Sequence, residues 1–190
     1  KALVAHGAKH LVLIDSISPR RAPTAGRAAE AEQMDKAEWT AFRDRIATIA
    51  RMGAEEYGLT VGIHAHAAGF MDFEPELERL LEQSAVPLAR LHALYSLEGL
   101  KGLEGARLLT IALADRDERV REHAVKWVER RVTGSDPTAK SLQGLLLSLV
   151  DDPSVRVRCQ VALTLGAWSG PERNKALARI VIRDWDQPWV

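Results

Sequence analysis

The chain has 190 residues, enough for one ordinary domain or two small units, and 46% hydrophobic with 27% charged residues is typical of a folded chain. Lysine plus arginine equals aspartate plus glutamate, 26 of each, so no overall field attracts nucleic acid or an anionic membrane. A single cysteine, Cys159, excludes a disulfide framework, a cysteine-based zinc site and covalent haem attachment.

No apolar stretch approaches the ~20 residues that cross a bilayer, so no membrane span is expected. The chain begins at Lys1, already in a helical pattern, with neither an initiating methionine nor a signal-like segment. Such a start is expected of a fragment. The location of the protein therefore stays open, with the cytoplasm favoured by default.

Residues 1–83 alternate between strand and helix patterns. Continuous apolar runs predict strands buried on both faces, and apolar residues three and four apart predict an amphipathic helix. This order predicts βαβ units and a parallel sheet. The expected elements are a helix tail ended by Gly7, strands over 10–15 and 60–66, a loop over 16–32, a helix over 35–57 and a helix over 76–83 after Pro75.

Two histidines and an aspartate stand where these strands end. His64 and His66 are two residues apart on the second strand, so both imidazoles are expected on one face. Asp15 ends the first strand in the corresponding place, and α/β folds keep their sites at the carboxyl ends of strands. The group is suited to holding a divalent metal or a sugar hydroxyl. The alternative is that the histidines merely decorate a strand end.

Several motifs of this segment, in order, resemble the xylose-isomerase-like sugar phosphate isomerase/epimerase family, above all its inosose dehydratase branch. They are GAKHLVLID at 7–15, WTAF at 39–42, IA at 49–50, EYGL at 56–59, HAH at 64–66 and FEPELERLL at 73–81. The resemblance implies part of a TIM barrel and a divalent-metal site (Mn, Co or Mg) that stabilises an enediolate. It makes His64, His66, Asp72 and Asp15 the candidate metal or substrate ligands.

The chain departs from that family in two ways. The branch reads His-Pro-His, then Gly-Thr, then Glu or Gln, where this chain has Ala65, Ala68-Gly69 and Asp72. A TIM barrel also needs roughly 250 residues and eight strands, whereas this sequence turns helical after residue 83. The isolated chain is therefore predicted to be inactive, because ligands from one or two strand ends cannot surround an ion.

Residues 84–190 contain a helical repeat. Its arginine-led motifs, RLHA at 90–93, REHA at 121–124 and RCQV at 158–161, recur after 31 and 37 residues. Two fuller copies, 108–121 and 145–158, each join an apolar helix, an Asp-rich turn and a second helix that opens on Val-Arg. A partial copy covers 176–184.

The turn aspartates should hold the repeats together. Asp115 and Asp152 are expected to cap the second helix of their repeat and to pair with an arginine, Arg121 or Arg158, of their own or the adjacent repeat. The tryptophans of this segment are expected in the core or between repeats. They are Trp127, Trp168, Trp185 and Trp189.

Two stretches, LHALYSLEGL at 91–100 and DERVREHA at 117–124, resemble the HEAT repeats of large bacterial dehydrogenase-like proteins. There a HEAT segment precedes a c-type cytochrome, but this chain has no haem-attachment motif. The resemblance implies a stacked α-solenoid, a protein partner and no enzymatic activity. The alternative is an ordinary helical bundle. The expected fold class is thus mixed: a partial α/β segment over 1–83, then an all-α solenoid over 84–190.

Three functions compete. The repeat favours a protein-binding scaffold that carries an incomplete barrel segment. The two histidines favour a sugar isomerase, epimerase or dehydratase whose missing strands come from elsewhere, for instance by self-association. The abrupt change near Gln83 favours a truncated or fused reading frame without a joint function. We rank them in that order.

Overall fold

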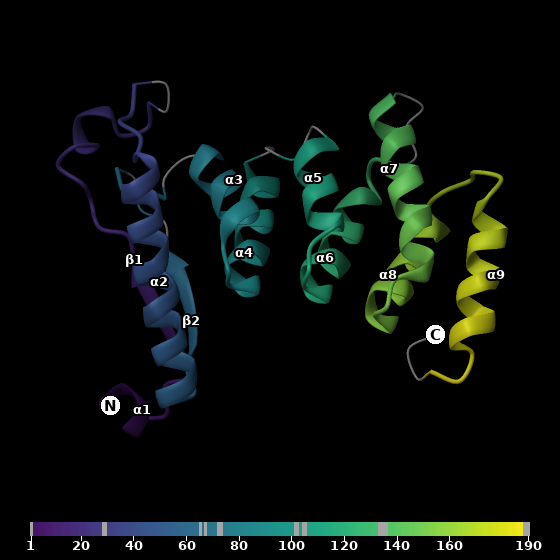
Figure 1. Ribbon diagram of the computed structural model, residues 1–190, viewed down its shortest axis with the longest axis horizontal. Helices are drawn as coiled ribbons and strands as arrows, with labels where there is room; N and C mark the ends of the chain where they lie inside the picture. The colour runs from purple at the N-terminus through teal and green to yellow at the C-terminus, as the bar shows by residue number, and fades with distance from the viewer. Residues whose placement is uncertain are drawn as a thin grey trace. The chain divides into compact units, whose positions relative to one another are not determined.

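A computed structural model describes residues 2–27, 30–64, 66, 68–71, 74–100, 103, 106–132 and 137–187. The chain divides into two compact units, Lys1–Ala89 and Arg90–Val190. Most of the described residues are helical, and the strands among them form one two-stranded parallel sheet (Figure 1). The sequence placed the change to repeats after residue 83; the division by contacts falls inside the helix that follows.

The first unit contains a βαβ unit. Its elements are α1 (Ala2–Ala5), β1 (His10–Ile14), η1 (Ala22–Thr24), α2 (Lys36–Tyr57), β2 (Thr60–His64) and α3 (Glu74–Gln83). The strands pair in parallel from His10 opposite Thr60 to Ile14 opposite His64. Both strands end earlier than predicted, because the hydrogen-bonded pairing of β1 with β2 stops at Ile14 and His64.

The long helix α2 is defined at both ends by its own sequence. Asp35 caps it through a reciprocal capping box with Glu38, and Gly58 ends it at φ 62°, a left-handed conformation that glycine adopts without strain. Gly53 lets α2 approach β2, because a Cβ there would overlap the Cγ2 atom of Val61. The helix therefore covers one face of the sheet closely.

The other face of the sheet is exposed. Val12 and Ile14 on β1 are 59% and 62% exposed, which contradicts the prediction of a strand buried on both faces. A continuous apolar run is typical of a strand in a parallel sheet that is covered on both sides, but here only one face is covered. The described strands of the first unit form one βαβ unit with an open sheet face.

The helix α3 packs on the N-terminal half of α2. Trp39 of α2 donates a hydrogen bond from Nε1 to Oε1 of Gln83 over 3.1 Å, and the guanidinium of Arg79 lies 5.9 Å from the Trp39 ring centroid. The loop after β1 joins this contact through the buried ion pair of Arg21 with Glu76, at 3.0 Å. These contacts close the first unit at the end of the strands.

The second unit is helical in all its described elements. They are α4 (Pro87–Gly99, whose first residues belong to the first unit), α5 (Ala106–Leu113), α6 (Glu118–Val128), α7 (Pro137–Ser148), η2 (Leu149–Asp151), α8 (Val155–Gly166) and α9 (Arg173–Asp184). Helix α5 packs against α6 and α7, α6 against α8, and α8 against α9. Each of these α-helices buries apolar residues on one face, although Leu163 of α8 and Val181 and Ile182 of α9 are more than half exposed.

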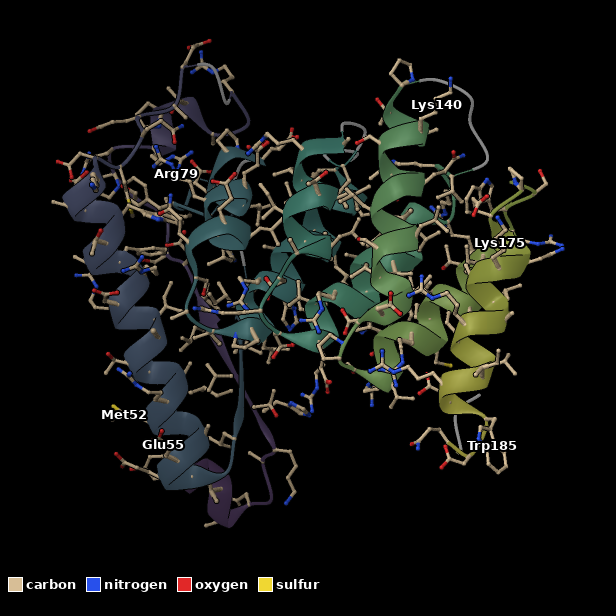
Figure 2. All side chains as sticks on the ribbon, turned by 45° about the vertical axis from the view of Figure 1, so that its right-hand side comes forward. Met52, Glu55, Arg79, Lys140, Lys175 and Trp185 are labelled. Atoms are coloured by element: carbon tan, nitrogen blue, oxygen red, sulfur yellow. The ribbon has the colours of Figure 1, made fainter. Side chains whose placement is uncertain are left out.

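The tryptophans of residues 84–190 differ in their exposure to solvent. Trp168 is buried and Trp127 is half-buried against α4, as predicted. Trp185, just after α9, is 77% exposed and stands clear of the helix in Figure 2, so its prediction as a packed residue is wrong. No described helix follows α9 to cover it. Trp189 lies outside the described residues.

Candidate functional site

The predicted strand-end ligands are only partly brought together. His64 is the last residue of β2, and His66 lies beyond the strand, so the prediction that both stand on one strand face is wrong. Their rings still meet edge to face, with centroids 5.5 Å apart. Asp15 follows β1 and accepts a hydrogen bond at Oδ2 from the backbone N–H of Met71 over 2.8 Å.

Asp15 is held by the loop after β2. A Cβ on Gly69 would fall 2.5 Å from Asp15 Oδ2, so only glycine allows this approach. The neighbouring Ala68 adopts φ 64°, a strained conformation for any residue with a Cβ, at a position where the resembling family has glycine. The carboxylate is thus oriented towards this loop.

The metal implied by the family resemblance finds an incomplete ligand set. Among the described residues, no group of three or more His, Cys, Asp or Glu side chains is placed to hold an ion. Asp72, the remaining candidate, lies outside them. The two imidazoles by themselves supply at most two of the four or more ligands that a divalent cation takes.

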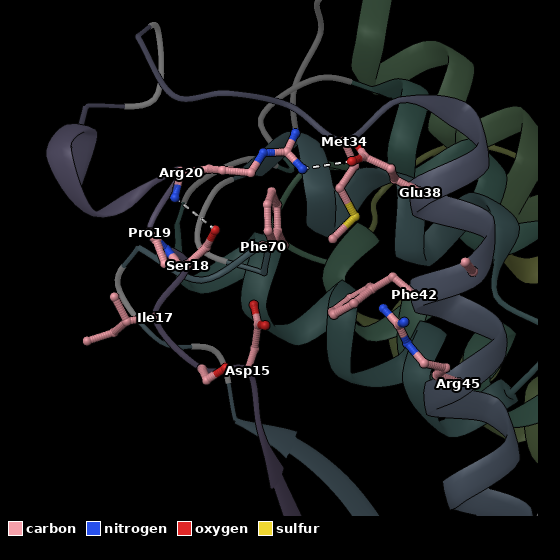
Figure 3. Close-up of a pocket in the computed structure, with 12 residues that line it drawn as sticks. Asp15, Ile17, Ser18, Pro19, Arg20, Met34, Glu38, Phe42, Arg45 and Phe70 are labelled. Atoms are coloured by element: carbon pink, nitrogen blue, oxygen red, sulfur yellow. Dashed lines mark hydrogen bonds and ion pairs between the residues drawn. The ribbon is translucent and has the colours of Figure 1, made fainter.

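A pocket of about 490 Å³ opens beside Asp15, between the loop after β1 and the start of α2 (Figure 3). Phe42 and Arg45 project into it from α2, and Phe70 faces them. Neither histidine lines the pocket. The sequence identified Asp15 but missed these α2 residues, which carried only the signal of helix periodicity.

The rim of this pocket is an exposed charge cluster. Arg20 binds the carboxylates of Glu32 and Glu38, the latter at 2.7 Å, and its guanidinium lies 5.5 Å from the Phe70 ring centroid. The hydrogen bonds from Arg20 lower the pKa of Glu32 and of Glu38 below the usual range for glutamate. Because all three groups are solvated, the cluster orders the loop without contributing much stability.

In the second unit, the repeat arginines form a series of buried ion pairs. Each guanidinium binds an aspartate from the following repeat through two nitrogens, a bidentate geometry that is both strong and directional. The pairs are Arg90 with Asp115 (2.7 and 2.6 Å), Arg121 with Asp152 (2.7 and 2.8 Å) and Arg158 with Asp184 (2.6 and 2.5 Å).

The remaining nitrogen of two of these arginines binds a backbone carbonyl. Arg121 Nη1 donates to the carbonyl oxygen of Asp115 over 2.7 Å, and Arg158 Nη1 to that of Asp152 over 2.6 Å. Each of these arginines therefore contacts the turn of its own repeat by backbone and the next repeat by carboxylate. We call the whole series the Arg–Asp ladder.

The sequence left open whether each turn aspartate pairs with an arginine of its own or of the adjacent repeat, and in the ladder the pairing is between adjacent repeats. The prediction that Asp115 and Asp152 cap the helices is wrong. The helix caps are Asp117 for α6 and Ser154 for α8. Asp115 and Asp152 stand two residues earlier and accept the backbone N–H of those caps at 2.8 and 2.9 Å. These hydrogen bonds order the turn before the helix. The same carboxylates also bind the arginine of the preceding repeat, so they are not available to cap the helix itself.

The ladder also perturbs its own groups. The hydrogen bonds that Arg121 donates to Asp152 raise the pKa of Arg121, and those that Arg158 donates to Asp184 raise the pKa of Arg158. Reciprocally, the Arg158 guanidinium lowers the pKa of Asp184. These groups therefore remain charged in the folded protein across the physiological range of pH.

An aromatic cluster joins α4 to α6. The Tyr95 ring lies edge-on to His123 and to Trp127, with centroids 5.4 and 5.3 Å apart, and its hydroxyl shares a 2.5 Å hydrogen bond with Nδ1 of His123. Burial lowers the pKa of His123 and raises that of Tyr95. His123 is thus a neutral packing residue at neutral pH.

No family model, curated protein or solved structure matches this chain. Among the described residues, no helix has both the length and the apolar character that crossing a membrane requires.

Proposed function

We propose that the second unit is a HEAT-type helical array that binds a protein partner, and that the first is a partial isomerase-like barrel segment carried with it. The observation that supports this most is the Arg–Asp ladder, which repeats one bidentate junction at three successive positions. In a helical bundle without repeats, nothing favours the same pair of side chains at repeat spacing. In stacked repeats, each repeat contacts only its neighbours through equivalent positions, so the same pair of side chains recurs at every junction.

Such stacking favours binding over catalysis. The cores of α4, α6 and α8 are buried, so the outward side chains of three repeats share one preordered surface. Preordering lowers the entropy cost of association, which is how solenoids use extended faces for recognition.

Site-specific photo-crosslinking in the protein's native cells tests this proposal. A benzophenone side chain is placed at Ser96 or Gln160, on helices α4 and α8, and at Lys140 or Lys175 on helices α7 and α9 as controls (Figure 2). We expect one dominant protein adduct from some of these four positions and not from the others, because a partner covers only part of the surface. Absence of any saturable protein adduct from all four positions would reject the binding function.

The enzyme alternative is favoured by the contact of His64 with His66 beside Asp15. Enolisation of a sugar needs an electrophile for the developing oxyanion and a base on the other side of the carbon. With ligands from two strand ends, the isolated chain should bind divalent metal weakly and turn over neither inosose nor common ketoses with Mn²⁺ or Co²⁺. Turnover that depends on metal and is abolished by His64→Ala would instead support an isomerase completed by self-association.

A further inference from the structure

The outward face of α6 carries a row of cations. Arg119 and Lys126 of α6 are exposed and seven residues apart, on the side of the helix opposite its buried residues, and the exposed Arg130 follows two residues after the helix ends. Among the described residues, the Arg119 guanidinium has no ion-pair partner. Lys126 reaches Glu122 only at 3.7 Å.

The carboxylates next to this row are already shared. Glu122 receives both Lys126 and Arg156 of α8, and Glu98 of α4 receives both Arg130 and Arg131. Both glutamates are largely covered, while three of the four cations are much more exposed. The exposed Glu118 and Glu129 belong to the same segment but not to this row, so the face is distinguished by its row of cations rather than by a large excess of positive charge.

Helices α4 and α8, which both contact α6, also expose apolar side chains. Tyr95 of α4 is 43% exposed and packs on Trp127, over which Arg130 lies at 5.6 Å. Leu163 of α8 is 65% exposed. The buried Nε1 of Trp127 finds no acceptor among the described residues, so a donor is left beside the cations.

We propose that this face of α4, α6 and α8 binds an acidic protein segment with interspersed apolar side chains. The inference rests on the proposed binding function and specifies its partner. Carboxylates would meet Arg119, Lys126 and Arg130, and apolar side chains would cover Tyr95 and Leu163. Complementary charge of this kind sets partner choice and association rate.

A protein segment fits better than nucleic acid. The cations alternate with Glu98 and Glu122, whose charges a continuous phosphate backbone would meet unfavourably. The balanced total charge provides no long-range field for a polyanion. An acidic peptide can place its carboxylates at the cations and its apolar side chains between them.

Fluorescence anisotropy on the full chain tests the inference. The probe is a labelled peptide in which glutamates alternate with leucine and phenylalanine; the comparison ligands are the same peptide with lysine for glutamate and a single-stranded oligonucleotide. We expect saturable binding of the acidic probe alone, weakened by salt, and an affinity loss of about tenfold or more in the triple variant Arg119→Glu, Lys126→Glu, Arg130→Glu.

The matched control reverses three exposed cations elsewhere, Arg51→Glu, Lys140→Glu and Lys175→Glu, and should bind like the wild type. Circular dichroism confirms that each variant is folded. No binding of the acidic probe, an unchanged affinity in the α6 variant, or tighter binding of the oligonucleotide would overturn the inference. Crosslinking of a protein at other faces would still uphold the binding function, so the two failures are separable.

Discussion

In the second unit, Leu94, Val120 and Val161 are completely buried, whereas in the first unit Val12 and Ile14 of β1 are more than half exposed. Val12 and Ile14 come from a continuous apolar run, whereas Val120 stands between two arginines, so local apolar character did not decide which residues are buried. The difference lies in how each kind of element satisfies its neighbours. A helix makes its backbone hydrogen bonds internally and needs only packing partners, while a strand needs further strands and covers on both faces.

The comparison extends to charge. The ladder buries bidentate pairs such as Arg158 with Asp184 and links each helix pair to the next, whereas the Arg20 cluster of the first unit is solvated. Buried pairs of good geometry specify one register, because a slip would strand a charge away from water. The second unit is therefore specified by charge as well as by apolar packing. The exposed cluster of the first unit cannot do the same, and the buried ion pair described in that unit, Arg21 with Glu76, is a single contact and not part of a repeated series.

The largest expected effect separates the two segments. Residues 84–190 expressed alone should give a helical circular dichroism spectrum and a cooperative melt, since the array just meets the roughly three repeats that stacking requires. Residues 1–83 alone should melt without cooperativity, because an isolated two-stranded sheet is marginal. A disordered spectrum from 84–190 would break the comparison and reject the array.

Next comes the ladder. Asp152→Ala leaves the Arg121 guanidinium without its bidentate partner in a largely buried site and should cost about 3–5 kcal/mol of unfolding free energy. Asp117→Ala, which removes only the exposed cap of α6, should cost about 1 kcal/mol. Urea denaturation of both variants gives the ratio. Equal losses would show that the ladder is no stronger than a helix cap.

A smaller effect is expected where α2 meets the sheet. Gly53→Ala puts a methyl group into the space of Val61 and should destabilise the first unit by about 1–3 kcal/mol. Gly144→Ala is the matched control, since a Cβ on that helical glycine meets no neighbouring atom. In chains whose other four tryptophans are replaced by phenylalanine, thermal melts monitored by Trp39 fluorescence report on the first unit. If the two variants melt alike, α2 does not pack on β2 this closely.

The smallest effect is a pH dependence confined to the second unit. Arg158 depresses the pKa of Asp184 in the folded chain, so this pair contributes its full stability above the ordinary carboxyl pKa of about 4. As pH falls through the lower folded pKa, the unfolded state takes up the proton first and the contribution is lost. Asp184→Asn should therefore be less stable than wild type at pH 7, and the gap should narrow towards pH 3. A constant gap in urea titrations would contradict this coupling.

Local patterns were read well from the sequence. The apolar spacing and end signals of α2, Asp35 and Gly58, predicted that helix to within one residue. The recurrence of arginine and aspartate at repeat spacing predicted that these residues form ion pairs. These features depend on hydrogen bonds and contacts within a few residues, so neighbouring residues are sufficient to predict them.

The tertiary structure decided everything that depends on distant partners. Arg121 pairs with Asp152 of the following repeat, and Tyr95 packs on Trp127. The strand β2 ends at His64, so His66 lies beyond it. The apolar run of β1 predicted a covered strand, yet whether a cover exists is a property of other elements. By itself, therefore, the sequence determined which residues seek burial or a charge partner. Only the fold decided which of them found one, because those partners lie tens of residues away along the chain.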